Sequence, residues 1–265
     1  MQTDFQSAHP LQVTGLEIGY KTKKEVHSLA TDLNFTLPPG SLNAVVGVNG
    51  VGKSTLLRTL SGMHPTLQGK VHLQGIPLDD MEPLRRAQCL SVVLTEPLAS
   101  KNLTVTELVR LGRHPYTNWI GQLSPADRTR VAFALDRMEL QPIADQPCHT
   151  LSDGQLQRTL IGRALAQDTP LMLLDEPTTH LDLYHKVNIL KLLKQVAHTA
   201  GKTILFSTHE IDLAIQLCDQ ILILDADFSQ FGSPCQLIES GAFEKLFPTD
   251  TIRFDRTTGM FKVNK

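Results

Sequence analysis

The stretch GVNGVGKST, residues 47–55, decides the fold of this chain. The apolar run LNAVV (42–46) comes directly before it, and LLRTL (56–60) comes directly after it. A buried strand that enters a glycine-rich loop, followed by a helix that leaves it, is the local context of a phosphate-binding loop. The sequence therefore predicts such a loop at the carboxyl end of a strand.

The residues of this loop suit a nucleoside triphosphate. Gly47, Gly50 and Gly52 let the backbone curl so that its N–H groups point inward at the phosphates. Lys53 adds a positive charge toward the β and γ groups, and Ser54 supplies a hydroxyl to Mg²⁺. The alternative, a glycine-rich turn that binds no nucleotide, is disfavoured by the strand and the helix around it.

Short β-rich runs alternate with helical stretches along the chain, which indicates an α/β fold. We expect a P-loop NTPase core with a largely parallel sheet and an antiparallel β edge. The expected strands are LNFTL (33–37), LNAVVG (42–47), KVHLQG (70–75), LSVVLT (90–95), LMLLD (171–175), TILFST (203–208) and QILIL (220–224).

The pattern changes to helices between Pro97 and Asp168. Thr104 and Glu107 have the spacing of a capping box, and Ser124 stands before a proline that suits the first position of a helix. We therefore expect one domain over residues 1–265, with a helical subdomain at about 97–168 inserted into the α/β core.

Two carboxylates follow the buried strand in PLMLLDEP, residues 170–177. Open α/β sheets bind ligands at the carboxyl ends of their strands, so Asp175 is placed to hold Mg²⁺ through water and Glu176 to polarise the water that attacks the γ-phosphate. Another expected strand ends at His209, which could hydrogen-bond the γ-phosphate. The alternatives are two surface acids and a structural histidine.

The run LSDGQLQRTLIGRALAQ, residues 151–167, has the apolar spacing of a helix. Ser152, Gly154 and Gln155 stand at its start, where small residues and free N–H groups suit an anion. The chain would then carry two phosphate sites.

The motifs GVNGVGKST, LSDGQ, LLDEP, THLD and STHE follow one another in the order and spacing of an ATP-binding cassette. Over nearly its whole length the chain resembles the nucleotide-binding subunit of an ABC transporter, which implies ATP and Mg²⁺ as cofactors. The resemblance gives Asp175 a role in holding the metal with Ser54, Glu176 the role of catalytic base, and Lys53 and His209 catalytic roles. It implies nucleotide contacts for Tyr20, Gly47, Asn49, Gly50, Val51, Gly52, Lys53, Ser54, Thr55, Ser152, Gly154, Gln155 and Asp182.

In this family the signature run of one subunit closes over the ATP held by the other, so the resemblance accounts for two phosphate sites. We expect a head-to-tail homodimer, with Asp182 in the loop that communicates between subunits. Asp153 replaces the usual first glycine of the signature, and we expect it to point outward and cap neighbouring N–H groups. Tyr20 matches the aromatic residue that stacks on adenine; the alternative is an ordinary tyrosine at a strand end.

Glu96 stands where related cassettes place a glutamine that reaches the Mg²⁺ and the attacking water. An ionised glutamate offers hard Mg²⁺ a charged ligand, so we expect Glu96 to be both a metal ligand and a catalytic residue. The alternative is a solvated loop acid.

The segment NLTVTELVRLGRHPYTNWIGQLS, residues 102–124, resembles the corresponding segment of importers of iron-siderophore complexes, haem and cobalamin. The expected partners are an integral membrane permease and, indirectly, a substrate-binding protein, which places the chain peripherally on the cytoplasmic face of the membrane. A helix of the permease would contact apolar residues of this segment, unless these simply pack the subdomain. They are Leu108, Leu111, Tyr116, Trp119 and Ile120.

Composition narrows the function further. The formal charge of −2 gives no support to a nucleic-acid partner, and no apolar stretch approaches the length of a membrane span. The four cysteines form no C-x-x-C pair, so we expect reduced thiols. Cassette proteins of DNA repair carry long coiled coils with heptad patterns, and those of translation carry two cassettes in one chain. This sequence shows no such heptads and one set of cassette motifs, which disfavours both classes. A soluble cassette ATPase of iron–sulfur assembly remains as the alternative to the importer.

Overall fold

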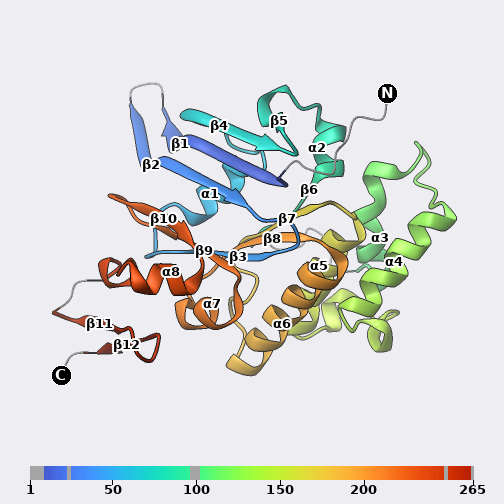
Figure 1. Cartoon of the computed structure of the whole chain (residues 1–265). Coiled ribbons are helices and arrows are strands. Elements are labelled where there is room, and N and C mark those ends of the chain that lie inside the picture. Colours follow the sequence, from blue (N-terminus) through green and yellow to red (C-terminus); the bar gives the residue numbers. More distant parts are fainter. Residues whose placement is uncertain (1–8, 23–24, 96–101, 248–249, 264–265) are drawn as a thin grey trace.

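The computed structural model describes residues 9–22, 25–95, 102–247 and 250–263. Its main sheet has the strand order β10-β9-β3-β8-β7-β6, in which β10 alone pairs antiparallel among the described residues (Figure 1). The strands are β3 (Leu42–Val46), β6 (Leu90–Val93), β7 (Leu171–Leu174), β8 (Thr203–Ser207), β9 (Gln220–Leu224) and β10 (Ser229–Gly232). The predicted α/β fold with a largely parallel sheet is confirmed.

A second, antiparallel sheet has the order β2-β1-β4-β5 and forms a separate layer over the main sheet (Figure 1). Its strands are β1 (Leu11–Lys21), β2 (Val26–Leu37), β4 (Gln68–Leu73) and β5 (Ile76–Pro77). Only parts of β2 and β4 were expected as strands. β1 was not, because its pairing with β2 and β4 shifts register near Gly15 and breaks the simple alternation of buried and exposed residues.

The phosphate-loop helix α1 (Lys53–Leu60) packs between these two sheets. Leu56, Leu57 and Leu60 are fully buried against apolar residues of both sheets. Its first turn begins at Gly52, whose φ of 108° is a left-handed conformation that a side chain disfavours. This packing fixes the loop before α1 relative to β3.

The opposite face of the main sheet is covered by helices (Figure 1). The chain regions beyond the two sheets contain α2 (Pro83–Cys89), α3 (Val105–Arg110), α4 (Pro125–Arg137), α5 (Asp153–Ala166), α6 (Leu183–Ala200), α7 (Ile211–Leu217), α8 (Pro234–Glu239), and the hairpin strands β11 (Ile252–Asp255) and β12 (Met260–Val263). Short 3-10 helices cover Leu78–Asp80, Leu111–Tyr116, Gln141–Ile143, Cys148–Thr150 and Phe243–Lys245.

Two of the expected helix starts are confirmed in the helical region. Thr104 accepts a hydrogen bond from the Glu107 backbone N–H and forms a capping box at the start of α3. Ser124 forms the same motif at α4 with Asp127. Asp127 also receives the buried guanidinium of Arg113 at 2.8 Å, so the 3-10 segment before α4 is tied to that helix. Removal of either partner of such a buried ion pair strongly destabilises the protein, because the other charge is left buried without compensation.

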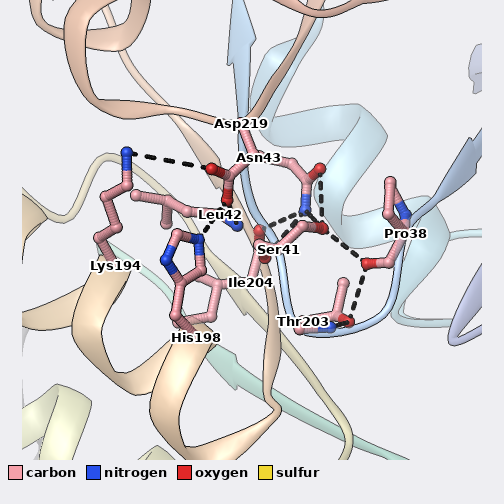
Figure 2. A network of polar contacts seen from close by, with 10 residues as sticks. Pro38, Ser41, Leu42, Asn43, Lys194, His198, Thr203, Ile204 and Asp219 are labelled. Carbon is pink, nitrogen blue, oxygen red and sulfur yellow. Dashed lines mark hydrogen bonds and ion pairs between the residues drawn. The ribbon is translucent and has the colours of Figure 1, made fainter.

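A polar network closes the amino end of the parallel strands, opposite the phosphate loop (Figure 2). The buried Asn43 side chain donates hydrogen bonds to the carbonyl oxygens of Ser41 and Ile204, and so joins β3 to β8. One carboxylate oxygen of Asp219 accepts the Leu42 backbone N–H at 2.8 Å and lies 2.8 Å from Nε2 of His198 on α6. The network thus fastens the end of α6 to two strands.

No helix in the described ranges is long and apolar enough to cross a membrane. All four cysteines are free; Cys89, Cys148 and Cys218 are buried and Cys235 is exposed.

Candidate active site

The phosphate loop, β7 and β8 bring the predicted catalytic residues Lys53, Glu176 and His209 to one edge of the main sheet. They line a pocket of about 520 Å³. Its lining residues are Tyr20, His27, Leu29, Asn49, Gly50, Gly52, Lys53, Ser54, Thr55, Glu176 and His209. They meet because β3, β8 and β7 are parallel neighbours whose carboxyl ends share this edge.

Lys53 is almost fully buried beneath the loop. Its Nζ donates hydrogen bonds to the carbonyl oxygens of Gly47 at 2.8 Å and Val48 at 3.1 Å. Burial lowers the pKa of Lys53, and the nearby carboxylates of Glu176 and Asp175 oppose that shift. The lysine is therefore a buried cation whose charge is balanced by loop carbonyls and acids.

Gly47 is required by the close approach of β9. A Cβ at this position would lie 2.2 Å from the carbonyl oxygen of Leu224, nearer than any real side chain comes. Only glycine therefore fits at the start of the loop.

Asp175 and Ser54 lie together, as the sequence predicts. The Ser54 hydroxyl donates to Asp175 Oδ1 at 3.0 Å, and the buried Ser207 hydroxyl donates to the same oxygen at 2.7 Å. A hydroxyl and a carboxylate are hard oxygen ligands of the kind Mg²⁺ prefers, and Mg²⁺ commonly completes its shell with substrate phosphates and water. These two side chains fit a magnesium ion bound together with a triphosphate.

Glu176 stands beside Asp175 in a strained position, with φ at 47°. Its backbone N–H donates to Ser207 Oγ at 2.8 Å, and Thr179 donates its hydroxyl to Glu176 Oε2 at 2.9 Å. Ser207 was not among the predicted site residues. The residue belongs to the motif STHE. Its contacts with the Asp175 carboxylate and the Glu176 backbone N–H depend on the pairing of β7 with β8.

His209 connects the two charged sides of the pocket. Its Nδ1 lies 3.2 Å from Lys53 Nζ, and its Nε2 is in hydrogen-bond contact with Glu176 Oε1. The ring therefore stands between the buried lysine and the glutamate at the place where a γ-phosphate would enter.

Tyr20 lies at the other end of the pocket and is 45% exposed. Its hydroxyl is 2.7 Å from Thr55 Oγ1, and the edge of its ring meets His64 at a centroid distance of 5.1 Å. His27 is its direct neighbour across the β1–β2 pairing and also lines the pocket. The sequence did not single out His27 or Leu29, because only the register of the hairpin brings them here.

Ser152, Gly154, Gln155 and Asp182 do not line this pocket. Ser152 caps α5 by accepting the Gln155 backbone N–H, whereas Asp153 is exposed at the first helical position. The expected outward direction of Asp153 fits this exposure, but the expected capping role was wrong, because the hydroxyl of the preceding residue already fills it. Asp182 caps α6 in the same way by accepting the His185 backbone N–H.

A separate groove of about 290 Å³ follows α3 and the 3-10 segment after it. Of the predicted permease contacts, Leu111 lines this groove. Tyr116, Trp119 and Ile120 are not among its lining residues, but like Leu111 they are exposed, with Trp119 at 93%. Leu108 is buried instead and packs inside the protein, so the alternative interpretation holds for this residue. Glu96 lies outside the described residues.

Known proteins share this arrangement of motifs. A family model described as ABC transporter matches residues 30–179. The achromobactin transport ATP-binding protein CbrD of Dickeya dadantii (strain 3937) is 35% identical over 237 residues, which cover 89% of this chain and 86% of that protein. The iron(3+)-hydroxamate import ATP-binding protein FhuC of Bacillus subtilis (strain 168) is 38% identical over 214 residues, covering 81% and 78%.

A solved structure is also similar. It is the dimeric ATP-binding cassette MJ0796 in a post-hydrolysis state bound to ADP and Pi. It has a TM-score of 0.71 and 27% identity, covering 83% of this chain and 97% of that chain.

Proposed function

Because the chain belongs to the family of ABC transporter ATP-binding proteins and is an ATP hydrolase, we propose that it drives import of an iron complex or cobalamin through a membrane permease. Among iron complexes we include siderophores and haem. The observation that carries the proposal is the convergence of Lys53, Asp175, Glu176 and His209 on one phosphate loop. The names of the two relatives describe achromobactin transport and iron(3+)-hydroxamate import. None of these comparisons supports the iron–sulfur alternative.

In this proposal ATP lies along the pocket, with its base at Tyr20 and its phosphates on the loop from Gly47 to Thr55, where Asn49 and Val51 stand beside the glycines. The N–H groups of the loop and the Lys53 ammonium balance the phosphate charge. Ser54 and Asp175 would hold Mg²⁺, which would supply positive charge to neutralise part of the charge on the phosphates.

Glu176 serves as the base. Its carboxylate accepts a proton from the water that attacks phosphorus, while the bond from the γ-phosphorus to the bridging oxygen breaks and ADP leaves. Ser207 and Thr179 hold the glutamate from both ends, so its carboxylate is oriented before the water arrives. His209 is positioned to exchange its contact with Glu176 for one with the γ-phosphate.

We propose that the second anion site acts on the partner subunit's nucleotide. Ser152, Gly154 and Gln155 stand at the start of a long helix and away from the pocket of their own subunit. Two copies in head-to-tail arrangement would each close over the ATP held by the other, with Asp182 at the junction. Hydrolysis would then release the closed dimer.

The exposed apolar residues beside α3 support a permease contact. Leu111, Tyr116, Trp119 and Ile120 offer an amphipathic helix of the permease an apolar surface. We place the chain peripherally on the cytoplasmic face of the membrane, with the substrate-binding protein acting through the permease. The stretch at about 97–168 would act as the helical subdomain of a single cassette domain over 1–265.

Purification of the full chain from solubilised membranes tests the proposal. We expect an integral membrane protein to copurify with the chain. When both are placed in vesicles, a loaded substrate-binding protein should raise ATP turnover by the chain. Turnover by the chain with only water-soluble partners, and no membrane protein retained, would contradict it.

A further inference from the structure

The imidazole of His185 joins two segments that come from different parts of the chain. Its Nδ1 lies 2.8 Å and 2.9 Å from the two carboxylate oxygens of Asp182, which also accepts the His185 backbone N–H at 2.8 Å. On its other edge the ring faces the first turn of α5. A Cβ built on Gly154 would lie 3.3 Å from Cδ2 of His185.

The contact with Asp182 fixes the orientation of the ring. Hydrogen bonds from the His185 backbone and side chain hold the pKa of Asp182 below its usual value, so this carboxylate is ionised and only accepts. Nδ1 must therefore carry the hydrogen and donate it. With Nδ1 directed at Asp182, the Cδ2 edge is turned toward α5.

The packing against Gly154 makes the ring a spacer. Gly154 is buried, whereas the His185 side chain is 52% exposed, so the histidine is the outer wall of this contact. Leu181 supplies the nearest atom outside the His185 ring to a Cβ at Gly154, at 3.8 Å. A cavity of about 190 Å³ lies beside the contact, lined in part by Gly154, Tyr184 and His185. Removal of the ring would join its space to that cavity and leave Gly154 without its closest support.

We propose that His185 is a positioning residue for ATP-driven dimerisation, because it sets the spacing between the Asp182 loop and the start of α5. The inference rests on the proposed function, in which both segments meet the partner subunit. Since His185 does not line the pocket of its own subunit, its loss acts on closure of the dimer and leaves the first binding of ATP unchanged.

The other end of α6 supplies a matched control. His198 lies on the same helix, is 45% exposed, and has Nε2 2.8 Å from Asp219 Oδ2 (Figure 2). It is thus a second half-exposed histidine in contact with an aspartate, but it belongs to the network at the opposite end of the parallel strands. His198→Ala removes the same chemistry at a site remote from the nucleotide.

The experiment measures dimerisation by analytical ultracentrifugation with saturating MgATP, in full-length chains that all carry Glu176→Gln to prevent hydrolysis. Binding of a fluorescent ATP analogue to dilute monomer is measured alongside. We expect His185→Ala to weaken dimerisation about 10-fold, a typical coupling between sites, with monomer affinity within about twofold of the parent. His185→Asn keeps a donor near the Nδ1 position and should recover dimerisation to within about threefold of the parent.

Unchanged dimerisation in His185→Ala, no recovery in His185→Asn, or an equal loss in His198→Ala would each overturn the inference. A loss of monomer ATP affinity as large as the loss of dimerisation would also overturn it. If the parent Glu176→Gln chain forms no dimer with MgATP, the proposed function itself fails, so the two failures are distinguishable.

Discussion

A single hydroxyl, that of Ser207, orients both acids of the site, and its removal has a magnitude that follows from the structure. Ser207 is fully buried on β8. It donates to Asp175 Oδ1 at 2.7 Å and accepts the Glu176 backbone N–H at 2.8 Å. Ser207→Ala therefore removes one hydrogen bond to a carboxylate and leaves one partly buried N–H without its acceptor.

The hydrogen bond to the charged group contributes about 1.5–3 kcal/mol, and an unsatisfied buried N–H costs about 1–3 kcal/mol. The two terms overlap in part, so we expect a loss of roughly 3 kcal/mol in the free energy of unfolding. The space vacated by one oxygen is too small for a replacement water. For a chain of this size the loss corresponds to a fall in Tm of roughly 6–12 °C.

Turnover should fall further than stability alone requires, because Glu176 loses the anchor that holds its strained backbone. A displacement of the carboxylate by about 1 Å costs up to about 100-fold in rate. Differential scanning fluorimetry and a phosphate-release assay at a temperature where the variant is folded measure the two effects separately.

Ser91→Ala is the matched control. Ser91 is a buried serine on β6, and its hydroxyl accepts from Thr169 at 3.0 Å, which is a bond between neutral groups. We expect a loss of about 1 kcal/mol in the free energy of unfolding and native turnover. If Ser207→Ala is no less stable than Ser91→Ala and turns over ATP at the same rate, the structural reasoning about the two acids is refuted.

Three further changes test other parts of the site. Glu176→Gln should keep ATP and Mg²⁺ binding but lose hydrolysis, because the amide accepts no proton; near-native phosphate release would remove Glu176 from the role of base. Gly154→Asp should leave monomer ATP affinity unchanged and abolish dimerisation, because its Cβ would lie 3.3 Å from Cδ2 of His185 and its carboxylate would displace that ring from the start of α5; an equal loss of affinity in the monomer would speak against this placement. Glu96→Gln should make ATP affinity less dependent on Mg²⁺, and superimposable Mg²⁺ titrations of the native and Glu96→Gln chains would contradict a metal-ligand role.

The core strands were predictable because each is a continuous apolar run buried on both faces. β3, β7 and β8 are fully buried, and their ranges differ from the expected ones by one residue at the carboxyl end. β1 was missed because its register shifts conceal the two-residue period. The order of strands across the sheet is a property of the whole fold, and no local pattern in the sequence encodes it.

The same distinction holds for the site. Lys53, Ser54, Asp175, Glu176 and His209 could be named from motifs, because each motif comes after a strand that ends at the ligand edge, directly or through the phosphate loop. The contacts between these residues could not be predicted from the motifs. The placement of one imidazole between a lysine and a glutamate depends on which strands are neighbours. So does the buried Ser207 hydroxyl, which bonds the Asp175 carboxylate and the Glu176 backbone N–H.

The carbonyl oxygens of Gly47 and Val48 hold the Lys53 ammonium while His209 contacts Glu176. The groups that would receive the phosphates are thus already satisfied by one another. ATP entry is for this reason a displacement reaction, in which each new phosphate contact replaces an internal one. The free energy of ATP binding is then the difference between two sets of polar contacts, so each new phosphate contact contributes less than its full strength. The internal contacts of Lys53 and His209 therefore compete with the phosphates for the same side chains.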